Sequence, residues 1–139
     1  MGKALPCRLF RVGCIRKDLY EVLETEEILF CEEGISGWIL MKNLKAPGRR
    51  SWRRRSWVVG FLVLTRRRLV AYVFGKPVLD VSLDARELSG VGVLCHRNRI
   101  EISFDPSLFH DEWSGEITLR FKSPMAGDFC QEFEKISGI

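Results

Sequence analysis

The sequence predicts a mainly β domain: about seven antiparallel strands in a barrel or sandwich, closed by a C-terminal α-helix. Between residues 35 and 121, short segments rich in β-branched and aromatic residues alternate with closely spaced turn residues. Connections this short join antiparallel neighbours, and a twisted sheet of this size tends to fold over itself. The tail at residues 125–136 instead has Phe129, Phe133 and Ile136 at helical spacing, which predicts a capping helix.

The first 30 residues predict a leader followed by a short helix. Residues 1–15 have no clear pattern and are expected to form a loosely ordered leader, so that residues 16–139 make up a single domain. Within residues 16–30, apolar side chains recur every three to five positions with acidic residues between them. That spacing predicts an amphipathic helix, and Glu32-Glu33-Gly34 then interrupts the pattern.

The middle of the chain predicts two strands joined by a basic loop. Residues 35–44 and 56–64 have strand composition, the second being SWVVGFLVL. Residues 45–55 have Pro47-Gly48 near their centre and are mostly charged, which predicts a loop.

Strand segments and turns continue in short alternation to the terminal helix. Further strands are expected at residues 69–74, 78–83, 91–95, 100–104 and 117–121, with one helical turn at 84–89. The last of these strands alternates apolar and polar residues, which is typical of a half-buried strand. Pro124 and Gly138 suit the start and the end of the final helix.

Charge is segregated along the chain. Residues 34–79 contain eleven basic residues and no acidic one, and since the whole chain carries +4, the rest carries −7. Like charges at close range repel, so folding alone does not require this clustering. An anionic partner would explain it, with arginine forks and lysines binding its anionic groups. The candidate anion-binding residues are Lys42, Lys45, Arg49, Arg50, Arg53, Arg54 and Arg55.

The segment Ser56–Phe74, SWVVGFLVLTRRRLVAYVF, resembles the second and third strands of pleckstrin-homology (PH) and GRAM-type domains, in which a strand ending in LT leads through a basic turn into RLxxY. The acidic lead-in at residues 24–29 and the segment 78–88 extend the resemblance to roughly residues 24–137. The terminal helix lacks the tryptophan usual in PH domains, which favours a GRAM-like or bacterial PH-like member.

The resemblance implies a phosphoinositide or anionic phospholipid site at the loop between the first two strands. The positions that match the family's head-group ligands are Lys42 and Lys45 before the loop and Arg53 and Arg55 after it. Trp52 and Trp57 flank the cluster, and an indole beside cations suits a membrane interface, with Trp52 as the candidate interface residue. The alternative is a solvated loop with Trp52 packed under arginine stems and Trp57 in the core. A cytoplasmic protein, peripherally attached to a membrane, is the corresponding expectation.

Three other kinds of partner compete with the lipid. An acidic protein surface would also suit the basic loop, as would the acidic lead-in of a second copy in a homo-oligomer. Nucleic acid is disfavoured, because single strands need aromatics on an exposed sheet face, whereas the aromatics here fit a core. The pI of about 8.9 also lies below the usual range for nucleic-acid binding.

No catalytic site, metal site or cofactor is expected. The chain has no nucleophile elbow, zinc-protease or phosphate-cradling glycine motif. Its five cysteines form no CxxC pair, and their odd number and scattered spacing argue against a disulfide framework and a zinc site. Cys31, Cys95 and Cys130 are expected to be buried thiols, which favours a reducing compartment.

Overall fold

The computed structural model describes residues 15–46, 48–109 and 112–137, with backbone but no side chains described at residues 46, 49–53 and 137. The elements in chain order are α2 (Lys17–Thr25), β1 (Ile28–Ala46), β2 (Arg49–Thr65), β3 (Arg68–Val73), β4 (Lys76–Ser82), η2 (Arg86–Gly90), β5 (Gly92–His96), β6 (Arg99–Phe104), η3 (Pro106–Leu108), β7 (Ser114–Lys122) and α3 (Ala126–Ser137). Residues 1–14 of the expected leader lie outside this description, while Ile15, its last residue, is buried.

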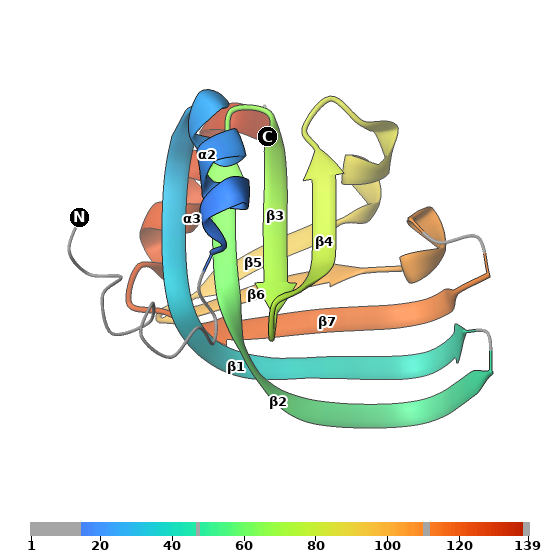
Figure 1. Cartoon of the computed structure of the whole chain (residues 1–139). Coiled ribbons are helices and arrows are strands. Elements are labelled where there is room, and N and C mark those ends of the chain that lie inside the picture. Colours follow the sequence, from blue (N-terminus) through green and yellow to red (C-terminus); the bar gives the residue numbers. More distant parts are fainter. Residues whose placement is uncertain (1–14, 47, 110–111, 138–139) are drawn as a thin grey trace.

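The described strands form one antiparallel sheet of seven strands in the order β4-β3-β2-β1-β7-β6-β5, which confirms the predicted mainly β fold. The long strands β1 and β2 bend, so the sheet curls over itself into a half-barrel (Figure 1). Helix α3 lies across one end of the curled sheet. A curled seven-stranded sheet with a C-terminal helix has the general shape of a PH domain.

Two glycines let neighbouring strands cross closely where the sheet bends. Gly37 on β1 pairs with Phe121 on β7, and Gly60 on β2 pairs with Val73 on β3. A Cβ atom at Gly37 would overlap the carbonyl oxygen of Arg120, and one at Gly60 would overlap that of Tyr72. Only glycine fits at such backbone contacts.

The main core lies inside the curl, and α3 closes it. Phe129 and Phe133 of α3 are buried there, which confirms the sequence expectation for the terminal helix. A smaller core lies on the opposite, outer face of the sheet. There Leu23 of α2 packs against Phe61 and Val63 of β2. The sheet is therefore covered on both faces, but its outer face only in part.

The expected loop at residues 45–55 is wrong. β1 and β2 form one long hairpin, and the pairing continues through Lys42↔Arg53 and Lys45↔Arg50 to Ala46↔Arg49. The connection shrinks to residues 47 and 48, with Gly48 at a φ of 73°. Strand pairing satisfies the backbone groups of both segments and leaves long basic side chains free to reach water. The basic residues therefore lie on paired strands.

The expectation that Cys95 and Cys130 are free thiols is also wrong. A disulfide joins them and links β5 to α3, with the two Cα atoms 6.3 Å apart. Cys31 lies outside this disulfide and is partly buried. The expectation of a reducing compartment was based on free thiols, and Cys95 and Cys130 no longer support it.

Reducing this disulfide is expected to lower the free energy of unfolding by roughly 3 to 4 kcal/mol, because the bond closes a loop of about 35 residues in the unfolded chain. Urea unfolding with and without a thiol reductant measures the difference. The Cys95→Ala/Cys130→Ala variant is the control, since its midpoint should not respond to the reductant. An unchanged midpoint in protein shown by mass to be reduced would contradict the prediction.

Candidate functional site

The candidate cations lie along the β1–β2 hairpin rather than in a loop. The side chains of Lys42, Lys45, Arg54 and Arg55 are described, and all four are exposed. Arg49, Arg50, Trp52 and Arg53 belong to β2 by their backbone, and their side chains lie outside the description. In the described part of the chain, no acidic side chain makes an ion pair with any of the four exposed cations. Their charge is therefore available to an external anion.

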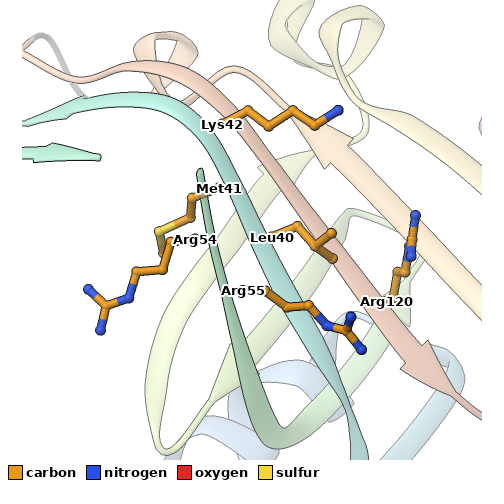
Figure 2. A pocket seen from close by; sticks show the side chains of 6 residues that line it. All are labelled: Leu40, Met41, Lys42, Arg54, Arg55 and Arg120. Carbon is orange, nitrogen blue, oxygen red and sulfur yellow. The ribbon is translucent and has the colours of Figure 1, made fainter. Parts of the chain in front are cut away.

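The hairpin divides these cations between the two faces of the sheet. Side chains alternate along a strand, and Ile39 and Val58 are buried in the inner core. Figure 2 shows Arg55 and Leu40 on one side of the two strands, and Arg54 with Met41 on the other. Sequence reasoning treated the cluster as one site, but paired strands separate neighbouring arginines.

The outer face combines Arg55 with two tryptophans. Trp38 on β1 pairs with Trp57 on β2, and on its other side with Arg120 on β7. The guanidinium carbon of Arg55 lies 4.1 Å from the centre of the Trp38 ring, a cation–π contact. Trp57 also packs against Phe74, with the ring centres 6.3 Å apart. Indole rings and guanidinium groups thus form one continuous surface.

Two neighbouring depressions open on this region. One, of about 490 Å³, lies among Leu40, Lys42, Arg55 and Arg120, and its lining also includes Met41 and Arg54 from the other side of the two strands (Figure 2). The other, of about 480 Å³, is lined by residues that include Trp38, Arg55, Trp57, Arg99, Arg120 and Lys122. Arg55 and Arg120 line both depressions. Arg120 is partly neutralised, because its Nε donates to a Glu101 carboxylate oxygen at 2.7 Å.

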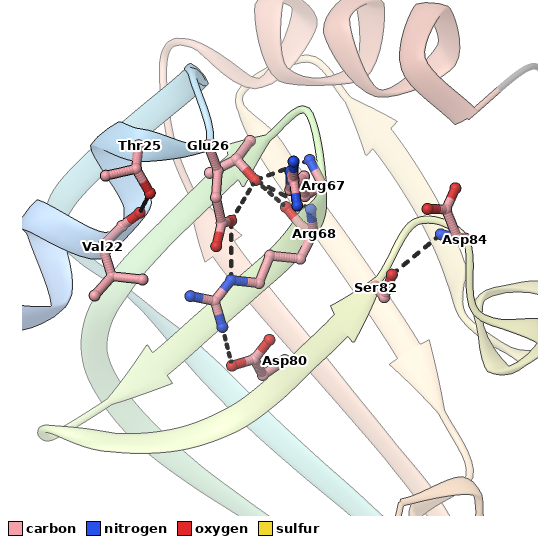
Figure 3. Close-up of polar contacts among 9 residues, drawn as sticks. Val22, Thr25, Glu26, Arg67, Arg68, Asp80, Ser82 and Asp84 are labelled. Carbon is pink, nitrogen blue, oxygen red and sulfur yellow. Dashed lines mark hydrogen bonds and ion pairs between the residues drawn. The ribbon is translucent and has the colours of Figure 1, made fainter.

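The second basic cluster, Arg66 to Arg68, belongs to a different site. Arg66 pairs with Glu27 at 2.8 Å. Arg68 pairs with Glu26 at 3.1 Å and with Asp80 at 2.8 Å (Figure 3). Burial by itself would lower the pKa of Arg68, but Asp80 and Glu26 outweigh it and raise the pKa above its ordinary value. None of these arginines lines either depression, so the two clusters form separate surfaces.

Sequence reasoning missed Trp38 and Arg120 as surface residues, whereas Trp57, which it placed in the core only in the alternative interpretation, is exposed. The alternation of apolar and polar residues at 117–121 could have identified Arg120 as a surface residue, because it lies between the apolar Leu119 and Phe121. The sequence argument against single-stranded nucleic acid assumed that the aromatics are buried. Trp38 and Trp57 do not fit that assumption, being 37% and 53% exposed.

Comparison with known proteins finds no family model that matches this chain and no curated protein that matches it. Within the residues described, no helix has both the length and the apolar character needed to cross a membrane. The functional argument therefore depends on the residues of this chain and their geometry.

Proposed function

We propose that this chain is a non-enzymatic binding module of the PH or GRAM-like type that attaches peripherally to anionic phospholipid head groups. The observation that carries the proposal is the group of exposed cations on the β1–β2 hairpin, Lys42, Lys45 and Arg55, which make no ion pair with an acidic side chain in the described part of the chain. Such cations gain roughly 1 kcal/mol each near an anionic membrane surface. The exposed indoles beside them suit the head-group region of a bilayer.

Single-stranded nucleic acid is the second candidate. Trp38 and Trp57 on an open sheet face beside Arg55 are features that bind unpaired bases by stacking and the backbone by charge. The overall charge of +4 and pI of about 8.9 favour the lipid, because nucleic-acid-binding domains are usually more basic. Docking to an acidic protein surface, or to a second copy of this chain, remains the alternative for the same cations.

Replacing Lys42, Lys45 and Arg55 with glutamine is expected to weaken binding to phosphatidylserine vesicles by about a hundredfold, because three cations at roughly 1 kcal/mol each are lost. Vesicle flotation measures the affinity. Raising the salt concentration should have a similar effect on the unmodified protein, since the Debye length falls from about 8 Å at physiological ionic strength to about 3 Å at 1 M.

The matched control replaces Arg66, Arg67 and Arg86 with glutamine. These three side chains are also exposed, and they lie outside the β1–β2 hairpin. Removing the exposed Arg66–Glu27 pair should cost little stability. Equal losses in the two triple variants would indicate diffuse attraction without a site. If the unmodified protein does not float with anionic vesicles, the lipid proposal fails and docking to a protein becomes the better account.

A further inference from the structure

We infer that the module meets the membrane face-on, through the outer face of β1, β2 and β7, with Trp38 and Trp57 in the head-group region. The inference rests on the proposed function and specifies which surface performs it. The hairpin has two exposed sides, so the presence of its cations alone does not choose between them.

The first argument is the exposed apolar surface on this face. Trp57, Phe74 and Leu94 are 53%, 52% and 67% exposed, although all three are large apolar side chains. Cross-strand pairing runs from Leu94 on β5 through Glu101, Arg120 and Trp38 to Trp57 on β2. Five neighbouring strands span about 19 Å at about 4.8 Å per strand. Within this region Trp38, Trp57 and Phe74 adjoin one another, and an exposed apolar cluster of this kind marks an interaction surface.

The second argument is what covers the rest of the same face. Helix α2 and Ile15 pack over Phe61, Val63 and Val70, where the outer face carries a small core of its own. Neither α2 nor Ile15 belongs to the packing around Trp38 and Trp57. Among the described residues, α2 and Ile15 therefore cover one half of the outer face, and the half with the two indoles stays exposed.

The third argument is charge, which identifies the occupant as anionic. Arg55, Arg99 and Lys122 line the same depression as the two indoles, and Arg120 beside them is paired with the acid Glu101. An anionic bilayer presents phosphates to such cations and an interfacial region to the indoles, whose rings prefer one apolar and one wet edge. The exposed Leu94 also fits a bilayer, because an aliphatic side chain offers no ring on which an unpaired base could stack.

The test uses two neighbouring arginines that differ in the face they occupy. Arg55→Gln should weaken binding to phosphatidylserine vesicles about fivefold, the equivalent of roughly 1 kcal/mol. Arg54→Gln removes the same charge from the other side of the same strand and should change binding less than twofold. Both side chains are exposed, and the substitution keeps their length, so the fold should tolerate both changes.

A second pair of variants tests the indoles. Trp57→Gln should weaken vesicle binding about tenfold, whereas Met125→Gln, another exposed apolar side chain, should leave it unchanged. In a Trp52→Phe/Trp113→Phe background, the fluorescence of Trp38 and Trp57 should shift to the blue on vesicle binding and be quenched by brominated lipid. Circular dichroism of each variant checks that the fold is retained.

The outcomes separate the inference from the proposed function. Flotation of the unmodified protein with equal losses for Arg54→Gln and Arg55→Gln, or with no change in tryptophan fluorescence, would overturn the face-on orientation and leave lipid binding standing. Absence of flotation would overturn both. Binding of an oligothymidylate with tryptophan quenching, together with no flotation, would assign the same face to single-stranded nucleic acid.

Discussion

Replacing Phe129 with alanine is expected to lower the free energy of unfolding by about 3 to 5 kcal/mol. Its side chain is fully buried, and its ring lies 5.2 Å from that of Phe30 in an edge-to-face contact and 6.1 Å from that of Phe133. The substitution removes both ring contacts and leaves a cavity between α3 and the sheet. A domain of this size is typically stable by only about 5 to 15 kcal/mol, so much of the stability would be lost.

Urea unfolding followed by circular dichroism measures the Phe129→Ala effect. Phe133→Ala should cost an amount in the same range, because its ring is also buried. Met125→Ala is the control, since that side chain is 43% exposed and its loss should change stability by less than about 0.5 kcal/mol. A cost below about 1 kcal/mol for Phe129→Ala would mean that α3 does not seal the core.

Replacing Gly60 with alanine is expected to destabilise the fold by about 3 kcal/mol or more, at or above the upper end of ordinary overpacking. The added Cβ would overlap the backbone carbonyl oxygen of Tyr72, which cannot rotate away as a side chain can. Either β2 and β3 separate at Gly60↔Val73 or the bend of β2 changes. Gly37→Ala should act in the same way through the carbonyl oxygen of Arg120.

The control for Gly60→Ala is the same substitution at Gly127. That residue lies in α3, and a Cβ there would have nothing within 4 Å. Alanine is favoured over glycine in helices, so Gly127→Ala should raise stability by roughly 0.5 to 1 kcal/mol. Thermal unfolding of the two variants should therefore move the midpoint in opposite directions. Similar midpoints would show that the strands at Gly60 can relax around a side chain.

Local sequence pattern was sufficient for much of the fold. The strand at residues 69–74 agrees with β3 (Arg68–Val73), and the helix at residues 125–136 agrees with α3 (Ala126–Ser137), to within one residue at each end. The helical turn expected at residues 84–89 corresponds to η2 (Arg86–Gly90). In each case the signal is a periodic or turn-forming pattern that residues close in sequence produce together.

The basic hairpin shows where local pattern stops being informative. Charged residues around Pro47-Gly48 are compatible with a loop or with a strand exposed to water. Whether the segment forms a strand depends on its pairing with Leu44 and its neighbours on β1. That pairing lets the hydrogen-bonded β1–β2 hairpin continue to the turn. Local pattern could not predict the disulfide either, because Cys95 and Cys130 are 35 residues apart and meet only when α3 packs on β5.

The sequence by itself determined that this chain forms an antiparallel β fold with a capping helix and that residues 42–55 are strongly basic. Tertiary structure alone decided that Arg54 and Arg55 occupy opposite sides of the hairpin and that Trp38 and Trp57 lie on an open face. The physical reason is that alternation along a strand specifies two faces but not which of them is covered. Coverage follows from the curl of the sheet and from where α2 and α3 pack on it.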